Sequence, residues 1–503
     1  MAIQLAYLAI MAIQVLIPQA FAIQQANLSM LPNFPTKPRL FILTDILNEP
    51  DDSMSMVRLL LYSNEFDLQG LCATTSASLR NATHPEAITE IIDAYGEVVD
   101  NLNSHVHPES QFRAAAQLKE LVVSGPKVYG NNALNQTISE GASLLVRSLK
   151  KSQDPLYVSI WGGANTLAQA LQHIERENSI PVAAKLRSRL RVYSISDQDD
   201  SGAYIRRRWS DLFYIVNVHG FGEYSAATWA GINAADNGAA NTTKVLDPWL
   251  TPNIRVGPLG SVYPLIAYGM EGDTPSFLWL IQNGLHNPAR PDWGGWGGRY
   301  ARITDLEGIQ EYGTSLDSAV GLTGRYMSPQ ATVWRWRDAY QEDFAARMQW
   351  SLTSNFSEVA HSPVIDVNGV RGTEPMQFQL PVNGSITLDA SKSYSPDDPT
   401  NDAYLEFQWY AYIEAGLPAA GQRLNQSFLQ VEALAPPSGT NGTLSVNAAG
   451  FENVVLGSKV RIVNHIPKIS VFEGVEWHII LQARSTNGVH PLYTYRRIVV
   501  ESF

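Results

Sequence analysis

The hydrophobic pattern of the first part of the chain alternates between short apolar runs and segments with a helical period. The apolar runs, which predict buried strands, cover residues 40–44, 68–75, 157–161, 190–195 and 212–216. Apolar residues spaced three and four apart predict helices over residues 53–63, 87–99, 140–149 and 165–176. Strands that alternate with helices indicate an α/β region with a mostly parallel sheet covered by helices.

The pattern changes twice further along. Residues 236–300 are rich in Gly, Pro and Trp, which predicts ordered loops rather than regular elements. A helical segment then closes the first domain, which we place at residues 39–355. From residue 363 the pattern is all-β, with short strands predicted at 385–390, 406–413, 459–463, 477–484 and 493–500.

The spacing of these later strands predicts a β-sandwich over residues 363–503. The run Leu388–Asp398 resembles the first strands of polycystic-kidney-disease-type immunoglobulin-like modules, which occur on secreted polysaccharide-active proteins. The expected fold is therefore an α/β domain followed by an all-β immunoglobulin-like sandwich.

The N-terminus predicts export. Residues 1–22 are apolar and end in Ala20-Phe21-Ala22, a small-residue cleavage site typical of a signal peptide; the alternative is an uncleaved membrane anchor. N-glycosylation sequons spread along the chain support an extracellular glycoprotein without a membrane segment after cleavage. The sequon asparagines are Asn27, Asn81, Asn135, Asn241, Asn355, Asn383, Asn425 and Asn441.

The charge balance restricts the partners. The formal net charge is −12, and only 17% of the residues are charged. Binding to nucleic acid through phosphates needs a basic surface, so the composition argues against a nucleic-acid partner. The oligomeric state is not indicated by the sequence.

An acidic turn follows the first predicted strand. Asp45, Glu49, Asp51 and Asp52 lie within eight residues, directly before an apolar-periodic helix. Carboxylates this close repel one another unless protons or a metal ion intervene, and oxygen ligands suit hard cations such as Ca²⁺. Helix capping and the helix dipole would explain Asp51 and Asp52, but not Asp45 at the strand end.

Other polar residues follow the later strands. Asn165 follows the strand at 157–161, and Asp199 and Asp200 follow the strand at 190–195, where each could also serve as a helix cap. Ligands of open α/β sheets bind beyond the carboxyl ends of the strands, so these residues and the acidic turn should share one rim. This shared rim predicts a functional site.

Four longer motifs carry a family resemblance. They are "TD…EPDD" (from Thr44 to Asp52), "SISDQDD" (from Ser194 to Asp200), "MEGDTPSF" (from Met270 to Phe277) and "PDWGGWGGRY" (from Pro291 to Tyr300). Together with Gly162-Gly163-Ala164-Asn165-Thr166, they resemble secreted cellulose-binding proteins that combine a nucleoside-hydrolase-like domain with an immunoglobulin-like C-terminal domain.

The resemblance implies roles for particular residues. In nucleoside hydrolases, aspartates and a backbone carbonyl hold a Ca²⁺ ion that orients the sugar hydroxyls and a water molecule. On this chain, Asp45 would be a ligand and the general base, and Asp52 a bidentate ligand. Asn165 would offer its carbonyl, and Asp273 the last carboxylate. Independently of the resemblance, the shared rim makes Asp51, Asp199 and Asp200 candidates for substrate contact.

One departure from the nucleoside-hydrolase pattern concerns the leaving group. The family's His-Asp pair reads Gly272-Asp273 here, so the His that helps the nucleobase leave is absent. Glu271 or His219 could take its place, and Glu271 is also a candidate substrate contact. Trp293 and Trp296, in a Gly-rich loop, either stack on sugar rings or pack within their own loop.

These observations predict a secreted hydrolase of N- or O-glycosidic bonds that depends on calcium and acts on carbohydrate. Paired carboxylates on the rim would also suit acid–base cleavage of a glycoside. A non-catalytic protein that binds cellulose or another polysaccharide is the alternative, and an extracellular nucleosidase is a further one.

Overall fold

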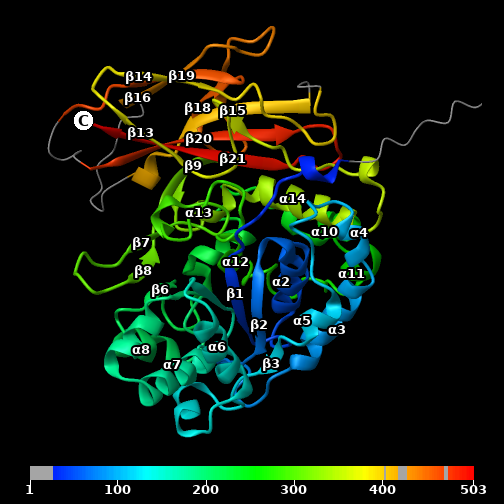
Figure 1. The fold of residues 1–503 in the computed structure, drawn as a ribbon, viewed down its shortest axis with the longest axis vertical. Helices are drawn as coiled ribbons and strands as arrows, with labels where there is room; N and C mark the ends of the chain where they lie inside the picture. The colour runs from blue at the N-terminus through cyan, green and yellow to red at the C-terminus, as the bar shows by residue number, and fades with distance from the viewer. Residues whose placement is uncertain (1–26, 401–403, 417–427, 469–473) are drawn as a thin grey trace, which may run out of the picture.

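An eight-stranded sheet forms the centre of the first domain (Figure 1). The computed structural model describes residues 27–400, 404–416, 428–468 and 474–503. The sheet order is β3-β2-β1-β4-β5-β6-β8-β7, parallel throughout except for the edge strand β7. The strands are β1 (Arg39–Thr44), β2 (Asp67–Ala73), β3 (Val122–Ser124), β4 (Leu156–Ile160), β5 (Leu190–Ser194), β6 (Phe213–Val216), β7 (Tyr300–Arg302) and β8 (Glu311–Thr314).

Helices cover both faces of this sheet, as the sequence predicted. Successive residues of β1 belong to different cores: Leu40 and Ile42 join the larger hydrophobic cluster, whereas Phe41 and Leu43 join a second one. The larger cluster includes side chains of α2 (Pro50–Leu61), α3 (Pro85–Gly96) and α14 (Arg337–Trp350), and the second includes those of α6 (Glu140–Lys151), α7 (Asn165–Glu177), α8 (Ile180–Arg187) and α9 (Ser201–Arg208). Among residues 27–235, which the structure describes, the other α-helices are α4 (Val99–Asn103) and α5 (Ala115–Lys119).

The segment predicted to be irregular contains several short helices. They are α10 (Asp247–Asn253), α11 (Gly257–Ser261) and α12 (Pro275–Leu278). Each begins with a proline within its first two positions, where the fixed φ favours a helical start and the missing N–H costs nothing. The expectation of loops alone was therefore wrong for these residues.

The C-terminal region is all-β, as predicted. A six-stranded sheet of order β13-β21-β20-β15-β18-β17 faces a three-stranded sheet of order β14-β19-β16 across a common hydrophobic cluster. The strands are β13 (Met376–Leu380), β14 (Ser385–Asp389), β15 (Leu405–Ala411), β16 (Leu429–Ala433), β17 (Thr443–Val446), β18 (Glu452–Leu456), β19 (Lys459–Asn464), β20 (Glu476–Ser485) and β21 (Tyr493–Ser502). Two hairpins precede it, β9 (Asp317–Gly321) with β10 (Gly324–Ser328), and β11 (Asp366–Val367) with β12 (Val370–Arg371).

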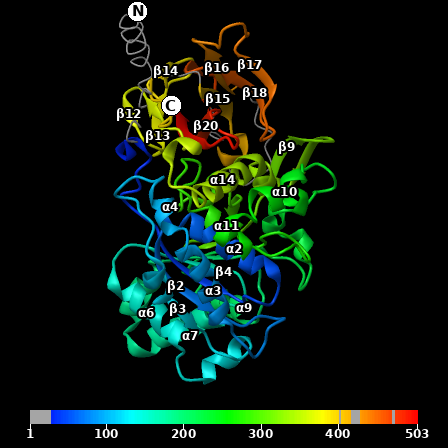
Figure 2. The same ribbon diagram turned by 90° about the vertical axis from the view of Figure 1, so that its right-hand side faces the viewer.

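The sandwich packs directly on the first domain near α13 (Ala331–Trp334) and α14 (Figure 1), and Figure 2 shows α14 next to the sandwich in the second view. Trp336 makes ring contacts with Tyr412, Phe451 and Tyr495, at centroid distances of 5.9, 5.4 and 5.9 Å. The larger hydrophobic cluster runs across this junction without interruption. The two regions therefore share one core.

A buried ion cluster lies at the same junction. Asp317 accepts hydrogen bonds from Arg299 Nε at 2.7 Å, Arg335 Nη1 at 2.8 Å and the Tyr412 hydroxyl at 2.6 Å. Burial opposes ionisation of Asp317, but the charges of Arg299 and Arg335 outweigh it and hold its pKa below the usual value. The aspartate thus connects the first domain to the sandwich.

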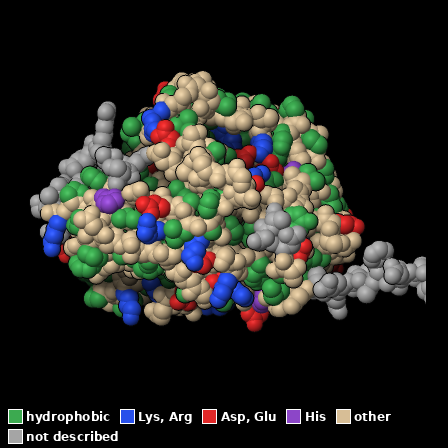
Figure 3. Space-filling model, turned by 90° about the horizontal axis from the view of Figure 1, so that it is seen from above, with side chains coloured by type: hydrophobic (Ala, Val, Ile, Leu, Met, Phe, Trp, Pro, Cys, Tyr) green, Lys and Arg blue, Asp and Glu red, His purple; other side chains and the backbone are tan. Residues whose placement is uncertain are grey.

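The surface agrees with the charge argument. On the face shown in Figure 3, Lys and Arg side chains are interspersed with Asp and Glu rather than gathered into one basic patch. Within the described residues, no helix combines the length and the apolar character needed to cross a bilayer. The predicted signal peptide, residues 1–22, lies outside the described residues.

Candidate functional site

The polar residues that follow the parallel strands meet at one edge of the sheet, as predicted. Asn165, which follows β4, connects the ends of three strands. Its Oδ1 accepts a hydrogen bond of 2.8 Å from the hydroxyl of Thr74, which follows β2. Its backbone N–H donates a hydrogen bond of 3.1 Å to the carboxylate of Asp199, which follows β5. Its side-chain Nδ2 also donates to Thr75 Oγ1 at 2.8 Å. The rim is therefore a connected structure rather than a set of separate loops.

Three carboxylates form a compact acidic cluster on this rim. Asp51, Asp52 and Asp273 each place one oxygen within 4.8 Å of the others. Asp51 and Asp52 lie in the first turn of α2, and Asp273 directly precedes α12, more than 200 residues later. Asp52 and Asp273 are buried and Asp51 is half-buried. Three carboxylates in this arrangement can hold a cation.

Asp45 lies beside the cluster, at the end of β1. It is buried, and its Oδ2 has no hydrogen-bond partner. Gly162, after β4, allows the close approach: a Cβ there would lie 2.6 Å from Asp45 Oδ1. Asp273 Oδ2 is also buried without a partner. Buried polar atoms are normally satisfied, so two orphaned carboxylate oxygens suggest a ligand.

The electrostatics of the site disfavour four negative charges. Burial, with repulsion from Asp51 added to it, raises the pKa of Asp45 to about 7. Burial and repulsion from Glu49 raise the pKa of Asp51 to about 6. The pKa values of Asp52 and Asp273 lie well above the usual range, chiefly because of burial and then because of neighbouring carboxylates. Protons or a cation would relieve this repulsion.

The compact cluster differs in membership from the predicted ligand set. It contains Asp51, which was predicted to contact substrate, and Asp45, which was predicted to be a ligand, lies outside it. Asp52 is oriented by Thr44, whose hydroxyl donates to Asp52 Oδ1. The roles of Asp45 as ligand and base, of Asp51 as a substrate contact and of the Asn165 carbonyl as a ligand stay predictions.

Asp199 and Asp200 support the rim instead of facing a ligand. Asp199 is buried and accepts hydrogen bonds from the backbone N–H groups of Asn165, at 3.1 Å, and Ser201, at 2.8 Å. Asp200 is exposed and accepts from the N–H of Asn131 at 2.8 Å. Their predicted substrate contacts are not supported by these positions.

Glu271 was wrongly predicted to contact substrate or to act on the leaving group. It is fully buried and forms an ion pair with Arg58 at 2.5 Å. It also accepts hydrogen bonds from Tyr263 at 2.7 Å and Thr274 at 2.9 Å. Both carboxylate oxygens of Glu271 are hydrogen-bonded to other residues of the protein. Its role is therefore to hold the segment that carries Asp273 in place.

Trp293 and Trp296 were wrongly considered as an exposed sugar-stacking surface. Trp296 is fully buried, and Trp293 is 2% exposed. Trp296 contacts Tyr340 and Tyr495, and Trp293 Nε1 donates to Glu476 Oε2 at 3.2 Å. Both tryptophans belong to the junction with the sandwich.

A substitution tests this structural role. Trp293→Phe should destabilise the protein by about 1–3 kcal/mol, because the hydrogen bond to the charged Glu476 is lost. Polysaccharide affinity of the folded variant should equal that of the wild type. Thermal unfolding and binding isotherms measure the two effects, and a loss of affinity without a loss of stability would contradict the assignment.

Sequence reasoning missed an aromatic row on the rim. His219, Tyr224 and Trp229 lie in series, with ring centroids 5.4 and 6.1 Å apart. The row begins at the end of β6 and ends beside Gly272, where a Cβ would lie 2.9 Å from both Trp229 and Asp51 Oδ2. The aromatic residues that follow His219 in the sequence were the available signal.

The sequon asparagines are accessible. Asn27, Asn81, Asn135, Asn241, Asn355, Asn383 and Asn441 are all exposed, and Asn425 lies outside the described residues. Exposure is a requirement for glycosylation, and the modification itself stays a prediction.

Comparisons with known proteins agree with this architecture. The chain resembles a solved nucleoside hydrolase-related hypothetical protein from Saccharophagus degradans that is associated with carbohydrate metabolism. The two share 27% identity, with a TM-score of 0.71, over 93% of this chain and all of the other. An inosine-uridine preferring nucleoside hydrolase from Bacillus anthracis matches at 13% identity and a TM-score of 0.30, over 50% of this chain and 83% of the other. No curated protein matches.

Two family models match the chain. One describes the nucleoside hydrolase-like domain of cellulose-binding Sde182 and covers residues 39–300. The other describes the C-terminal domain of cellulose-binding protein Sde0182 and covers residues 385–502. The first alone spans more than half of the chain. The protein therefore belongs to the family of Sde182-type cellulose-binding proteins with a nucleoside hydrolase-like domain.

Proposed function

We propose that the protein is a secreted, calcium-dependent hydrolase of glycosyl bonds whose substrate is a carbohydrate or glycoside. The observation that carries this proposal is the acidic cluster of Asp51, Asp52 and Asp273 beside Asp45, whose Oδ2 is buried without a hydrogen-bond partner. A protein that only binds sugar has no need for an unpartnered carboxylate oxygen at the point where a base would act.

The cluster suits Ca²⁺. This ion takes six to eight oxygen ligands, including carboxylates that bind through one or both oxygens. Asp51, Asp52 and Asp273 would hold it, and a bound Ca²⁺ would supply orientation and polarisation of sugar hydroxyls and water. Asp45, which lies outside the compact cluster, would accept the proton of the attacking water.

The surroundings favour a sugar substrate. The His219–Tyr224–Trp229 row offers apolar ring faces beside the acidic cluster, and such faces stack on pyranose or furanose rings. Gly272 occupies the place of the histidine that assists nucleobase departure in nucleoside hydrolases. Carbohydrate is therefore preferred to a nucleoside as substrate.

A non-catalytic polysaccharide-binding protein is the second candidate. It is favoured by the immediate surroundings of Asp273, where Gly272 offers no side chain and Glu271 is committed to Arg58. Without an acid for the leaving group, glycoside cleavage loses about 10²–10⁴-fold in rate. The cellulose-binding family name is compatible with either candidate.

A substrate panel separates these functions. The mature protein is incubated with aryl glycosides, cello-oligosaccharides and nucleosides, with Ca²⁺ or with chelator. Turnover of glycosides that disappears on chelation is the expected result. Turnover of nucleosides alone would identify a nucleosidase, and cellulose binding without turnover of any substrate would favour the binding protein.

The metal can also be tested through stability. In chelator, Asp273→Asn should raise the unfolding temperature, because it removes one of several buried carboxylates that repel each other. Ca²⁺ at about 100 times its dissociation constant should stabilise the wild type by about 2.7 kcal/mol and leave this variant unchanged. Asp200→Asn, at an exposed position, is the matched control. An equal calcium effect in Asp273→Asn would contradict the ligand assignment.

Export forms part of the same proposal. The apolar N-terminal segment and the exposed sequon asparagines support a secreted glycoprotein that meets its polysaccharide outside the cell. Expression of the full chain in a eukaryotic host, followed by N-terminal sequencing of protein from the medium, tests the predicted cleavage after residue 22. Retention in the membrane would indicate the anchor instead.

A further inference from the structure

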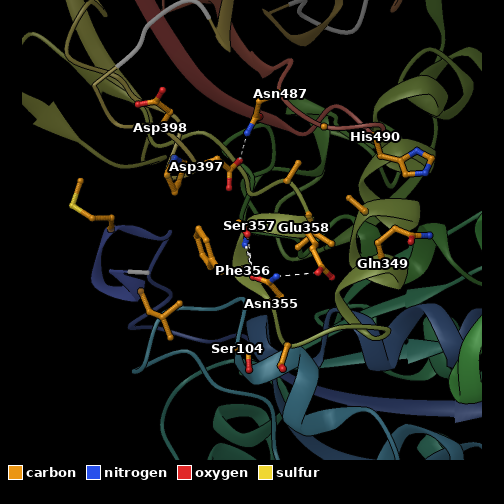
Figure 4. A pocket seen from close by; sticks show the side chains of 18 of the residues that line it. Ser104, Gln349, Asn355, Phe356, Ser357, Glu358, Asp397, Asp398, Asn487 and His490 are labelled. Atoms are coloured by element: carbon orange, nitrogen blue, oxygen red, sulfur yellow. Dashed lines mark hydrogen bonds between the residues drawn. The ribbon is translucent and has the colours of Figure 1, made fainter. Parts of the chain in front are cut away.

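A large cleft lies between the first domain and the sandwich, and it is separate from the acidic cluster. Its volume is about 1560 Å³. One side is formed by residues of α4, α14 and the segment 354–360, and the other by the sandwich segments 396–400 and 487–490 (Figure 4). Neither Asp45 nor any member of the acidic cluster lines it.

The charge of the cleft excludes anionic ligands. Among its described lining residues there is no Lys or Arg, whereas Asp100, Glu358, Asp397 and Asp398 contribute carboxylates. A phosphate, a nucleotide or an acidic polysaccharide would be repelled by such a surface. The ligand must therefore be neutral or cationic.

The remaining lining favours a neutral sugar. It is rich in amides and hydroxyls, which both donate to and accept from the hydroxyl groups of a sugar. Gln349 on α14 is half-buried, and within the described residues its side-chain amide makes no hydrogen bond to the protein. Figure 4 shows Gln349 to the right of the Asn355–Glu358 segment and below His490. An amide that lines the cleft without a protein partner can bond to a ligand.

Aromatic rings complete the surface. Phe356 stacks on His361, with ring centroids 3.8 Å apart and planes 8° from parallel, which fixes the orientation of its ring at the cleft. Tyr404, from the sandwich, is 37% exposed and lines the same cleft. Fixed aromatic faces beside amides are suited to sugar rings, which have apolar faces and polar edges.

We infer that this cleft binds a single neutral polysaccharide chain, of the cellulose type, at a site distinct from the acidic rim. The volume exceeds that of a typical small-molecule pocket, which is about 300–1000 Å³, and so accommodates several sugar units. The family descriptions of both matched regions name cellulose binding, and the cleft is built from both regions of the chain. A single cellulose chain that is separated from its neighbours can enter a cleft, whereas the flat surface of crystalline cellulose cannot.

Binding isotherms on amorphous cellulose and on soluble cellohexaose test the inference. The isotherms are measured on the secreted glycoprotein and again after removal of N-glycans, because the predicted glycosylation sites Asn27 and Asn355 line the cleft. Gln349→Ala and Tyr404→Ala should each weaken binding about tenfold. The matched control is Gln377→Ala on β13, which is exposed and outside the cleft. Chelation and Asp273→Asn should leave binding unchanged, and crystalline cellulose should bind less than the amorphous form.

Two results would overturn the inference. One is wild-type affinity in both cleft variants; the other is loss of binding on chelation or in Asp273→Asn, which would place the polymer at the acidic rim. Hydroxyl-radical footprinting of the wild type supplies a readout without any variant. Cellohexaose should protect Phe356 and Tyr404, and the absence of protection would likewise contradict the site. Failure of hydrolysis, measured separately, would not affect these outcomes.

Discussion

Replacing Asp45 with asparagine is expected to lower kcat for the best glycoside substrate by about 10²–10⁴-fold, the usual contribution of a general base. The substitution keeps the shape of the side chain and removes its ability to take a proton. Asp45 lies beside the acidic cluster but outside its group of mutually close oxygens, so calcium-induced stabilisation should largely persist. Steady-state kinetics and thermal unfolding with and without Ca²⁺ measure the two effects.

Two comparisons make this prediction specific. Asp52→Asn should lose both turnover and calcium-induced stabilisation, because Asp52 belongs to the acidic cluster. Asp200→Asn should keep both, since Asp200 is exposed and its carboxylate accepts from the backbone N–H of Asn131, away from the acidic cluster. Full activity in Asp45→Asn would show that another group activates water, or that hydrolysis does not occur at this rim.

Asp317→Ala is expected to destabilise the whole chain by about 3–5 kcal/mol, the usual cost of leaving a buried charge without its partner. Arg299 and Arg335 would both lose their near carboxylate, leaving Arg335 only Glu414 at 3.9 Å, and Arg335 is 2% exposed and cannot turn to solvent. The Tyr412 hydroxyl would lose its acceptor as well. Because these groups join the first domain to the sandwich, both regions should unfold at lower temperature and together.

Calorimetry of Asp317→Ala beside Asp305→Ala tests this expectation. Asp305 is exposed, and its replacement should change stability by less than about 0.5 kcal/mol. Asp317→Asn, which retains the shape and some hydrogen bonding, should fall between the two. Separate transitions for the two regions, with the sandwich unaffected, would contradict the shared core.

The fold was predictable because local patterns determine it. The apolar runs of β1, β2, β4, β5 and β6 are buried on both faces, and this double burial made them recognisable. Parallel pairing then required their carboxyl ends to meet, which brought Asp45, Asn165 and Asp199 to one rim without knowledge of side-chain positions. The edge strands β3 and β7, and β8 beside β7, are short, carry no comparable pattern and were not predicted.

The chemistry of individual side chains was less predictable because it depends on distant partners. Glu271 pairs with Arg58, which lies 213 positions earlier in the sequence. The residues around Glu271 contain no pattern that predicts this pair. Trp293 and Trp296 lie in a Gly-rich segment typical of exposed loops, yet the sandwich covers them. The acidic cluster contains Asp51 rather than Asp45 because of the position of Asp273, which comes from a segment distant in the sequence.

The shared core at Trp336 and Asp317 also governs how the protein can meet a polymer. A polysaccharide-binding module that is joined to a catalytic domain by a flexible linker can bind the polymer at varying distances from that domain. The length of the linker then sets the effective concentration of the polymer at the catalytic domain. Here the sandwich has no such tether, because rings and ions of both regions interlock. The separation between cleft and acidic rim is thus constant, and only the length and bend of the polysaccharide can bridge it.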